Sequence, residues 1–212
     1  MIRQKSAVVL SFCTLALSAV VMSCGDSNVE TVQKGQQSAP ATQQQASKAP
    51  ASNSAAGTTS SAAGLSWSIP EGWDVMGPRP MRAATYMIGE GENSSECAVF
   101  FFGTGQGGDV QANIDRWIGQ FLQPDGSDSK AKAKTEHRHV GDLHADVIDL
   151  TGTYMSGGMG GQPTVPKAGY RLLGAIVEAP EGPLFFKLTG PAAAVEEIKP
   201  HFDNLVASLK KS

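Results

Sequence analysis

Hydrophobic and polar residues alternate with a period of two in several stretches after residue 64, and this pattern predicts β-strands. The first strand covers residues 65–69, where leucine, tryptophan and isoleucine alternate with serine, and a turn follows at residues 70–73. Two more strands are predicted near residues 82–88 and 96–102. Two hairpins are predicted farther along the chain, at residues 137–148 and 170–189.

Two segments place their apolar residues at helical spacing instead. The first runs from Val110 to Phe121, with Asp109 as its predicted N-cap. The second runs from Val195 to Leu209 and contains a proline at position 200, which we expect to bend the helix or divide it. The order of strands, helix, strands and helix predicts an α+β fold, in which two helices flank a mainly antiparallel sheet.

The first 23 residues have the layout of a secretory signal peptide. Basic residues at positions 3 and 5 precede an apolar run over residues 7–22, and Ser23 stands directly before Cys24. The run is shorter than the roughly 20 apolar residues that span a bilayer, and three hydroxyl residues interrupt it. We therefore expect this segment to be removed during export.

The same end of the chain resembles bacterial lipoprotein precursors. Their lipobox has an aliphatic residue three positions before the cysteine and a small one directly before it, as Val21 and Ser23 are here. The resemblance implies cleavage before Cys24 and attachment of fatty acyl chains such as palmitate to that residue; ordinary secretion is the alternative. In enteric lipoproteins an aspartate after the cysteine favours the inner membrane, so Gly25 makes the outer membrane the expected location.

Residues 25–63 differ in composition from the rest of the chain. They are mostly serine, alanine, glutamine, threonine and proline, with few charges and no aromatic residue. Such a segment buries too little apolar surface to offset its ordering entropy, so we expect a disordered tether. The predicted organisation is a signal peptide (1–23), a lipidated cysteine with a disordered linker (24–64) and a single globular domain (65–212).

Charge and cysteine content narrow the functional classes. The net charge is −3, and the excess of acidic residues lies after residue 64, which argues against a nucleic-acid partner. Of the three cysteines, Cys13 leaves with the signal peptide and Cys24 is the lipidation site, so Cys97 has no partner for an internal disulfide. Cys97 precedes the apolar residues 98–102, and we expect it to be buried rather than catalytic.

Short motifs at both ends of the predicted domain carry a second resemblance. Residues 67–73, Trp-Ser-Ile-Pro-Glu-Gly-Trp, are similar to the start of Mog1/PsbP-like α/β sandwich proteins, and residues 185–191 are similar to their last strand. Residues 107–120 are similar to a set of uncharacterised bacterial lipoproteins with the same layout. The resemblance implies a Mog1/PsbP-like sandwich with a binding or accessory role and no shared catalytic site.

Two glycine-rich segments are candidate ligand loops, but both lack part of the required pattern. Residues 103–108 fit G-x-G-x-x-G, whereas a dinucleotide site also needs a parallel βαβ unit, and the strands here are predicted to be antiparallel. Residues 157–163 lack the Gly-Lys-Ser/Thr ending of a P-loop, and no G-x-S-x-G elbow occurs in the chain. The sequence therefore predicts neither a cofactor nor an enzyme.

The strongest candidate for chemistry is the hairpin around residues 141–142, Gly-Asp, which suit a two-residue type II′ turn. With that turn, His139 pairs with His144 and His137 pairs with Asp146, and alternation places all four on one face. Directly opposed Cβ atoms are about 5 Å apart, and three imidazoles with a carboxylate suit zinc or copper. The alternative is that these side chains are only solvated, because the opposite face of the hairpin is apolar.

Two functional hypotheses follow. The leading one is a membrane-anchored envelope lipoprotein whose domain is a non-catalytic binding or accessory module, with an envelope protein as its partner and an unknown ligand. The alternative is an envelope protein that binds zinc or copper through the histidine-rich hairpin.

Overall fold

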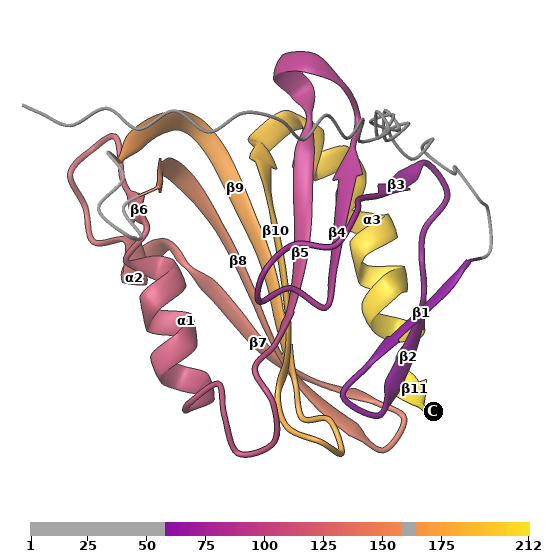
Figure 1. The fold of residues 1–212 in the computed structure, drawn as a ribbon. Coiled ribbons are helices and arrows are strands. Elements are labelled where there is room, and N and C mark those ends of the chain that lie inside the picture. Colours follow the sequence, from indigo (N-terminus) through magenta and orange to yellow (C-terminus); the bar gives the residue numbers. More distant parts are fainter. Residues whose placement is uncertain (1–57, 158–163) are drawn as a thin grey trace, which may run out of the picture. The chain divides into compact units, whose positions relative to one another are not determined.

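The computed structural model describes residues 58–157 and 164–212, which fold into antiparallel sheets with helices packed on them (Figure 1). The signal peptide, Cys24, most of the predicted linker and most of the glycine-rich segment 157–163 lie outside the described residues. The elements in chain order are β1 (Thr59–Ala62), β2 (Leu65–Ser68), β3 (Trp73–Val75), β4 (Ala84–Ile88), the 3-10 turn η1 (Gly91–Asn93), β5 (Ser95–Phe101), α1 (Val110–Ile118), β6 (Phe121–Leu122), α2 (Ser129–Lys132), β7 (Lys134–Val140), β8 (Leu143–Ser156), β9 (Val165–Val177), β10 (Leu184–Pro191), α3 (Ala192–Ala207) and β11 (Lys210–Lys211).

The main sheet has eight strands in the order β3-β4-β5-β10-β9-β8-β6, and β7 pairs with β8 as well. A smaller sheet has the order β1-β2-β11, and the pairings in both sheets are antiparallel. The predicted α+β fold, a mainly antiparallel sheet flanked by two helices, is confirmed, and α2 adds a short third helix. Within the described ranges, no helix is long and apolar enough to cross a membrane.

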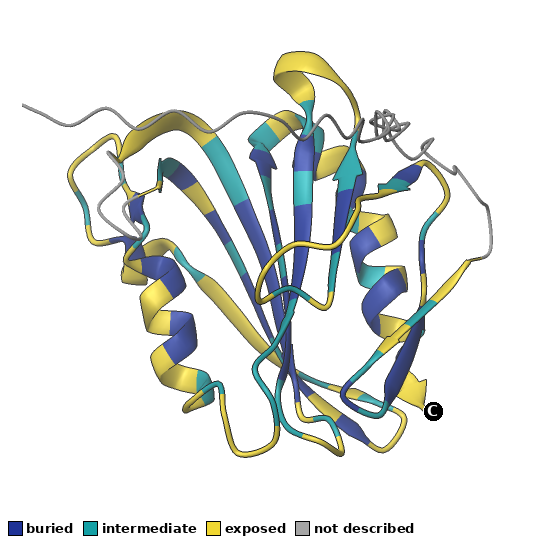
Figure 2. Cartoon of the chain, viewed as in Figure 1, coloured by how far each residue is buried: buried dark blue, intermediate teal, exposed yellow. Residues whose placement is uncertain are grey.

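Alternation along the central strands supplies two hydrophobic cores, one on each face of the main sheet (Figure 2). In β10, Phe186 enters the core that lies under α3, whereas its neighbour Phe185 enters the core under α1. Phe202 of α3 and Trp117 of α1 are the large buried side chains that the helices add to these two cores. The helices therefore cover opposite faces of the same strands (Figure 1).

Helix α1 begins as the sequence predicts and ends earlier. The Asp109 carboxylate accepts a hydrogen bond from the backbone N–H of Ala112 at 2.9 Å, which confirms the predicted N-cap. The helix stops at Ile118, so the inclusion of Phe121 was wrong. Phe121 lies in β6 instead, where its ring stacks on Tyr154 of β8 at a centroid distance of 5.1 Å.

Helix α3 is continuous from Ala192 to Ala207 with Pro200 inside it, so the expected division of this helix was wrong. Inside a helix, proline removes the hydrogen bond that its N–H would donate to the carbonyl four residues earlier, and its ring crowds that carbonyl. Ile198 and Phe202, on either side of the proline, are both buried in the same core. Their packing holds both halves of the helix against one sheet face.

The folded domain also includes residues before its predicted start at residue 65. Residues 59–62, which were assigned to the linker, form β1 and pair with β2 through a tight turn at Ala63 and Gly64. These residues are threonine, serine and alanine, so they show no apolar alternation that would predict a strand. Ala63 nevertheless contacts the core, and Ile69 N–H donates to the Thr58 carbonyl at 2.9 Å.

Candidate functional site

The β7–β8 hairpin has the register predicted from its turn. Val140 pairs with Leu143 across the loop, His139 pairs with His144, and His137 pairs with Asp146. The first loop residue, Gly141, has a φ of 58° and the second does not have a positive φ, which is the pattern of a type II′ turn.

The hairpin brings its three histidines together on one exposed face. One ligand nitrogen from each of His137, His139 and His144 lies within 4.8 Å of the other two. The rings of His139 and His144 are 4.7 Å apart between centroids, and the ring of His137 lies 5.6 Å from each. On the opposite face, Leu143 is buried, which confirms the expected split between a polar and an apolar side.

Asp146 lies beside this group without being part of it. Its Oδ1 is 3.1 Å from Nδ1 of His137, and it is not among the residues whose ligand atoms converge. The carboxylate therefore orients one imidazole, whereas the sequence suggested a fourth ligand. The remaining histidine, His201, lies on α3 outside the group.

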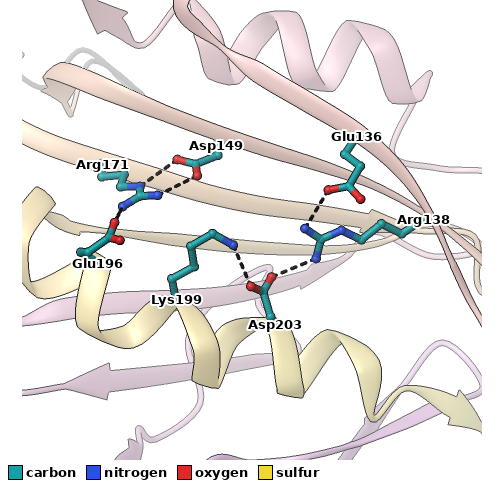
Figure 3. A network of polar contacts seen from close by, with 7 residues as sticks. All are labelled: Glu136, Arg138, Asp149, Arg171, Glu196, Lys199 and Asp203. Atoms are coloured by element: carbon teal, nitrogen blue, oxygen red, sulfur yellow. Dashed lines mark hydrogen bonds and ion pairs between the residues drawn. The ribbon is translucent and has the colours of Figure 1, made fainter.

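A second polar site lies in a groove of about 410 Å³ between α3 and the strands β7, β8 and β9 (Figure 3). Arg171 of β9 binds both carboxylate oxygens of Asp149 at 2.8 and 2.7 Å, and its third contact is Glu196 of α3. Only 14% of the Arg171 side chain is exposed. Because the pair is bidentate and largely shielded from water, it contributes more to the stability of the fold than an ordinary surface ion pair does.

The other half of the groove joins β7 to α3. Arg138 donates to Glu136 at 2.8 Å and to Asp203 at 2.9 Å, and Lys199 donates to Asp203 at 2.7 Å (Figure 3). Burial would raise the pKa of Asp203, but the hydrogen bonds from Lys199 and Arg138 lower it. The hydrogen bond from Arg138 likewise lowers the pKa of Glu136.

The charges in this groove largely neutralise one another. Three cations face four carboxylates, and each of the seven has a partner within the network: Glu136, Arg138, Asp149, Arg171, Glu196, Lys199 and Asp203. Such an arrangement fastens α3 to the sheet and leaves little uncompensated charge for a ligand.

A third feature is a half-buried cation on the opposite face of the sheet. Lys187 of β10 donates to Oε1 of Gln120 and lies 5.3 Å from the ring centroid of Tyr154. Burial, followed by the charges of Arg116 and Arg82, lowers the pKa of Lys187 to about 8. The ammonium group is thus held where it is easier to deprotonate than a surface lysine.

Sequence reasoning missed both the ionic groove and Lys187. A signal was present in the strands, since Asp149 stands between isoleucine and leucine and Lys187 stands between phenylalanine and leucine. A charged residue inside an apolar run indicates a buried polar contact. The sequence pattern does not identify the partners of such residues, because they can be far apart in the chain, as Arg138 and Asp203 are at 65 residues.

The remaining sequence candidates have structural roles. The loop 103–108 links β5 to α1, and both sheet partners of β5 are antiparallel, so the parallel βαβ unit of a dinucleotide site is not formed there. The Asn113 amide holds the loop by donating to the Gly107 carbonyl at 2.8 Å. Trp67 and Trp73, from the motif at residues 67–73, are buried in the core under α3.

Comparisons with known proteins give likenesses in structure. No family model matches the chain, and no curated protein matches it. Among solved structures it is similar to cyanobacterial PsbP (CyanoP) from Synechocystis sp. PCC 6803, with 11% sequence identity and a TM-score of 0.47. The match covers 78% of this chain and 99% of that one. The α+β fold itself follows from the strand pairings and the helices packed on them.

Proposed function

We propose that this chain is a lipid-anchored protein of the bacterial cell envelope whose folded domain binds a partner and catalyses no reaction of its own. The observation that carries the proposal is the state of the reactive groups in the described residues. Cys97 is fully buried, and burial raises the pKa of its thiol, which disfavours the thiolate that a nucleophile needs. The carboxylates of the groove are held in ion pairs.

The anchoring part of the proposal rests on the first 24 residues. They have a basic start, a short apolar run and a small residue before Cys24. The lipobox resemblance supports cleavage and acylation at that cysteine. Two or more acyl chains on one cysteine supply the double signal that stable membrane attachment needs. The polar linker would then hold the domain away from the membrane, with the outer membrane as the proposed location.

Replacing the acylated residue tests the anchor. Cys24→Ser is expected to move the protein from the membrane pellet to the soluble envelope fraction and to abolish incorporation of labelled palmitate. Cys97→Ala, which removes the buried thiol, serves as the matched control and should stay in the membrane with full labelling. A Cys24→Ser chain that remains membrane-bound would show that the anchor lies elsewhere.

The binding role needs a separate test in two steps. Crosslinking in intact cells should capture an envelope protein, and that protein, once purified, should bind the Cys24→Ser chain directly. If no captured protein binds the purified chain, the contact depended on proximity at the membrane, and the binding role is wrong.

A further inference from the structure

We propose that His137, His139 and His144 form a binding site for Zn²⁺ or Cu²⁺, in which Asp146 positions one of the ligands. This inference goes beyond the proposed anchoring and does not depend on it, because all four residues belong to the folded domain.

The spacing of the three imidazoles is close to what one ion requires. Their ligand nitrogens lie within 4.8 Å of one another, whereas nitrogens around a tetrahedral zinc are about 3.3 Å apart, given Zn–N bonds of about 2.0 Å. All three side chains are exposed, so rotation about their own side-chain bonds can close this gap without backbone movement.

The turn adds to this proximity. A type II′ turn closes with a hydrogen bond between its flanking residues, here Val140 and Leu143. Alternation along the ladder then makes His139–His144 a non-hydrogen-bonded pair, the kind in which opposed side chains lie closer together. His137 occupies the next such position, opposite Asp146.

The hairpin that carries the histidines is well supported from its other face. Leu143, Ala145 and Val147 are buried in the core under α3. Arg138, which lies between two of the histidines in β7, is fixed by Glu136 and Asp203. Because the backbone is held in this way, binding an ion orders only side chains, and less entropy is lost than in a free loop.

Asp146 determines which nitrogen of His137 faces the ion. With its Oδ1 3.1 Å from Nδ1 of His137, the carboxylate accepts the Nδ1 proton and leaves Nε2 with its free lone pair. A carboxylate behind a ligating histidine is a recurrent arrangement in zinc proteins, where it fixes the ring and raises its basicity. Asp146 is therefore a positioning residue rather than a ligand.

The ligand set selects the ion. Imidazole nitrogens suit Zn²⁺ and Cu²⁺, whereas Mg²⁺ and Ca²⁺ take oxygen ligands. Three protein ligands on an exposed face leave at least one coordination position for water or a small molecule. The order of stability of divalent metals predicts tighter binding of Cu²⁺ than of Zn²⁺.

Calorimetric titration of the purified full chain, produced without a polyhistidine tag and stripped of metal, tests the site. We expect one Zn²⁺ or Cu²⁺ per chain with micromolar or tighter affinity, and a loss of at least tenfold in affinity with His139→Ala or His144→Ala. His201→Ala, which removes the exposed histidine of α3, is the matched control and should bind as the wild type does. Metal-free melting midpoints confirm that each variant is folded.

The role of Asp146 has its own readout. Asp146→Asn should weaken metal binding about ten- to a hundredfold with the stoichiometry unchanged, and Asp146→Glu should recover part of the loss. ¹⁵N chemical shifts of His137 should show the Nδ1 proton in the wild type and a mixture of tautomers in Asp146→Asn. Unchanged shifts in that variant would overturn the positioning role.

Three results would overturn the site itself. They are affinity weaker than about 100 µM for both ions, equal binding after the triple His→Ala change, and a loss with His201→Ala as large as that with His139→Ala. The titration is repeated on the Cys24→Ser chain, which has neither acyl chains nor a thiol at that position, so these results do not depend on whether Cys24 is acylated.

Discussion

At the scale of a single residue, Lys187 lowers the stability of the fold because its charge is partly removed from water. Its ammonium lies beside Gln120 and Tyr154 in the core side of the sheet, and burial lowers its pKa to about 8, against an ordinary value of 10.5. Below pH 8 Lys187 is protonated in both the folded and the unfolded chain, so the whole free-energy cost of burying its charge is present. Between pH 8 and 10.5 the unfolded chain binds more protons, and stability rises with pH.

Lys187→Met should therefore stabilise the protein at pH 7, by about 1 kcal/mol, and this advantage should shrink as the pH rises above 8. Urea unfolding at pH 7, 8 and 9 measures the difference between variant and wild type. Burial raises the pKa of Cys97, so ionisation of this thiol in the unfolded chain lowers the stability of both proteins above pH 9. Taking the difference between variant and wild type removes this common effect. Lys210→Met, at an exposed position of β11, is the control. A constant difference across the range would contradict the buried-charge account.

At the scale of elements, the packing of α1 on the sheet depends on a residue with no side chain. A Cβ atom at Gly174 of β9 would lie 2.5 Å from the Trp117 ring and 2.7 Å from Ile148. Trp117 is the largest buried residue of α1, so this close approach sets how near the helix comes to the strands. Neither neighbour has a flexible end that can move away.

We expect Gly174→Ala to lower the free energy of unfolding by about 2 kcal/mol or more, because overpacking displaces Trp117 and with it α1. Chemical denaturation followed by tryptophan fluorescence, to which Trp67, Trp73 and Trp117 all contribute, measures the stability. Gly77→Ala is the matched control, since a Cβ there would meet nothing within 4 Å. Equal stability of the two variants would mean that α1 adjusts without loss.

The elements that could be predicted are those with long local patterns. The histidine hairpin was predictable in register because a two-residue turn fixes the pairing of its flanking strands. β1, β3 and β6 have two to four residues each, which is too short for a period of two to be recognised. β1 and β3 are held by pairing with the next strand, and β6 by pairing with β8. The ionic groove was unpredictable for another reason, because it forms only when α3 docks beside β7.

At the scale of the whole domain, the small sheet ties the two ends of the described chain together. β2 lies between β1 and β11, and the N–H of Ser212 donates to the Gly64 carbonyl at 3.0 Å. Leu65 and Trp67 of β2 are buried in the core under α3. β1 therefore covers a strand that carries core residues, although its own side chains are small.

A chain that begins at residue 65 should consequently be less stable than one that begins at residue 58. Loss of β1 removes its ladder to β2 and the buried Ala63, and we expect a melting midpoint lower by roughly 4 °C or more. The chain that begins at residue 58 should melt as the full-length protein does. Scanning calorimetry of the three chains makes the comparison, and equal midpoints would show that β1 is dispensable.

The position of Cys97 has a consequence for the time at which the protein is vulnerable. Its strand neighbours are Tyr86 on β4 and Leu188 on β10, and the core over it is completed by α3. Under the proposed export, the thiol stays open until β10 and α3, the last elements of this core, have followed it across the membrane. In an oxidising compartment the risk of a mixed disulfide is confined to that interval, and its length is set by the rate at which the C-terminal elements are delivered.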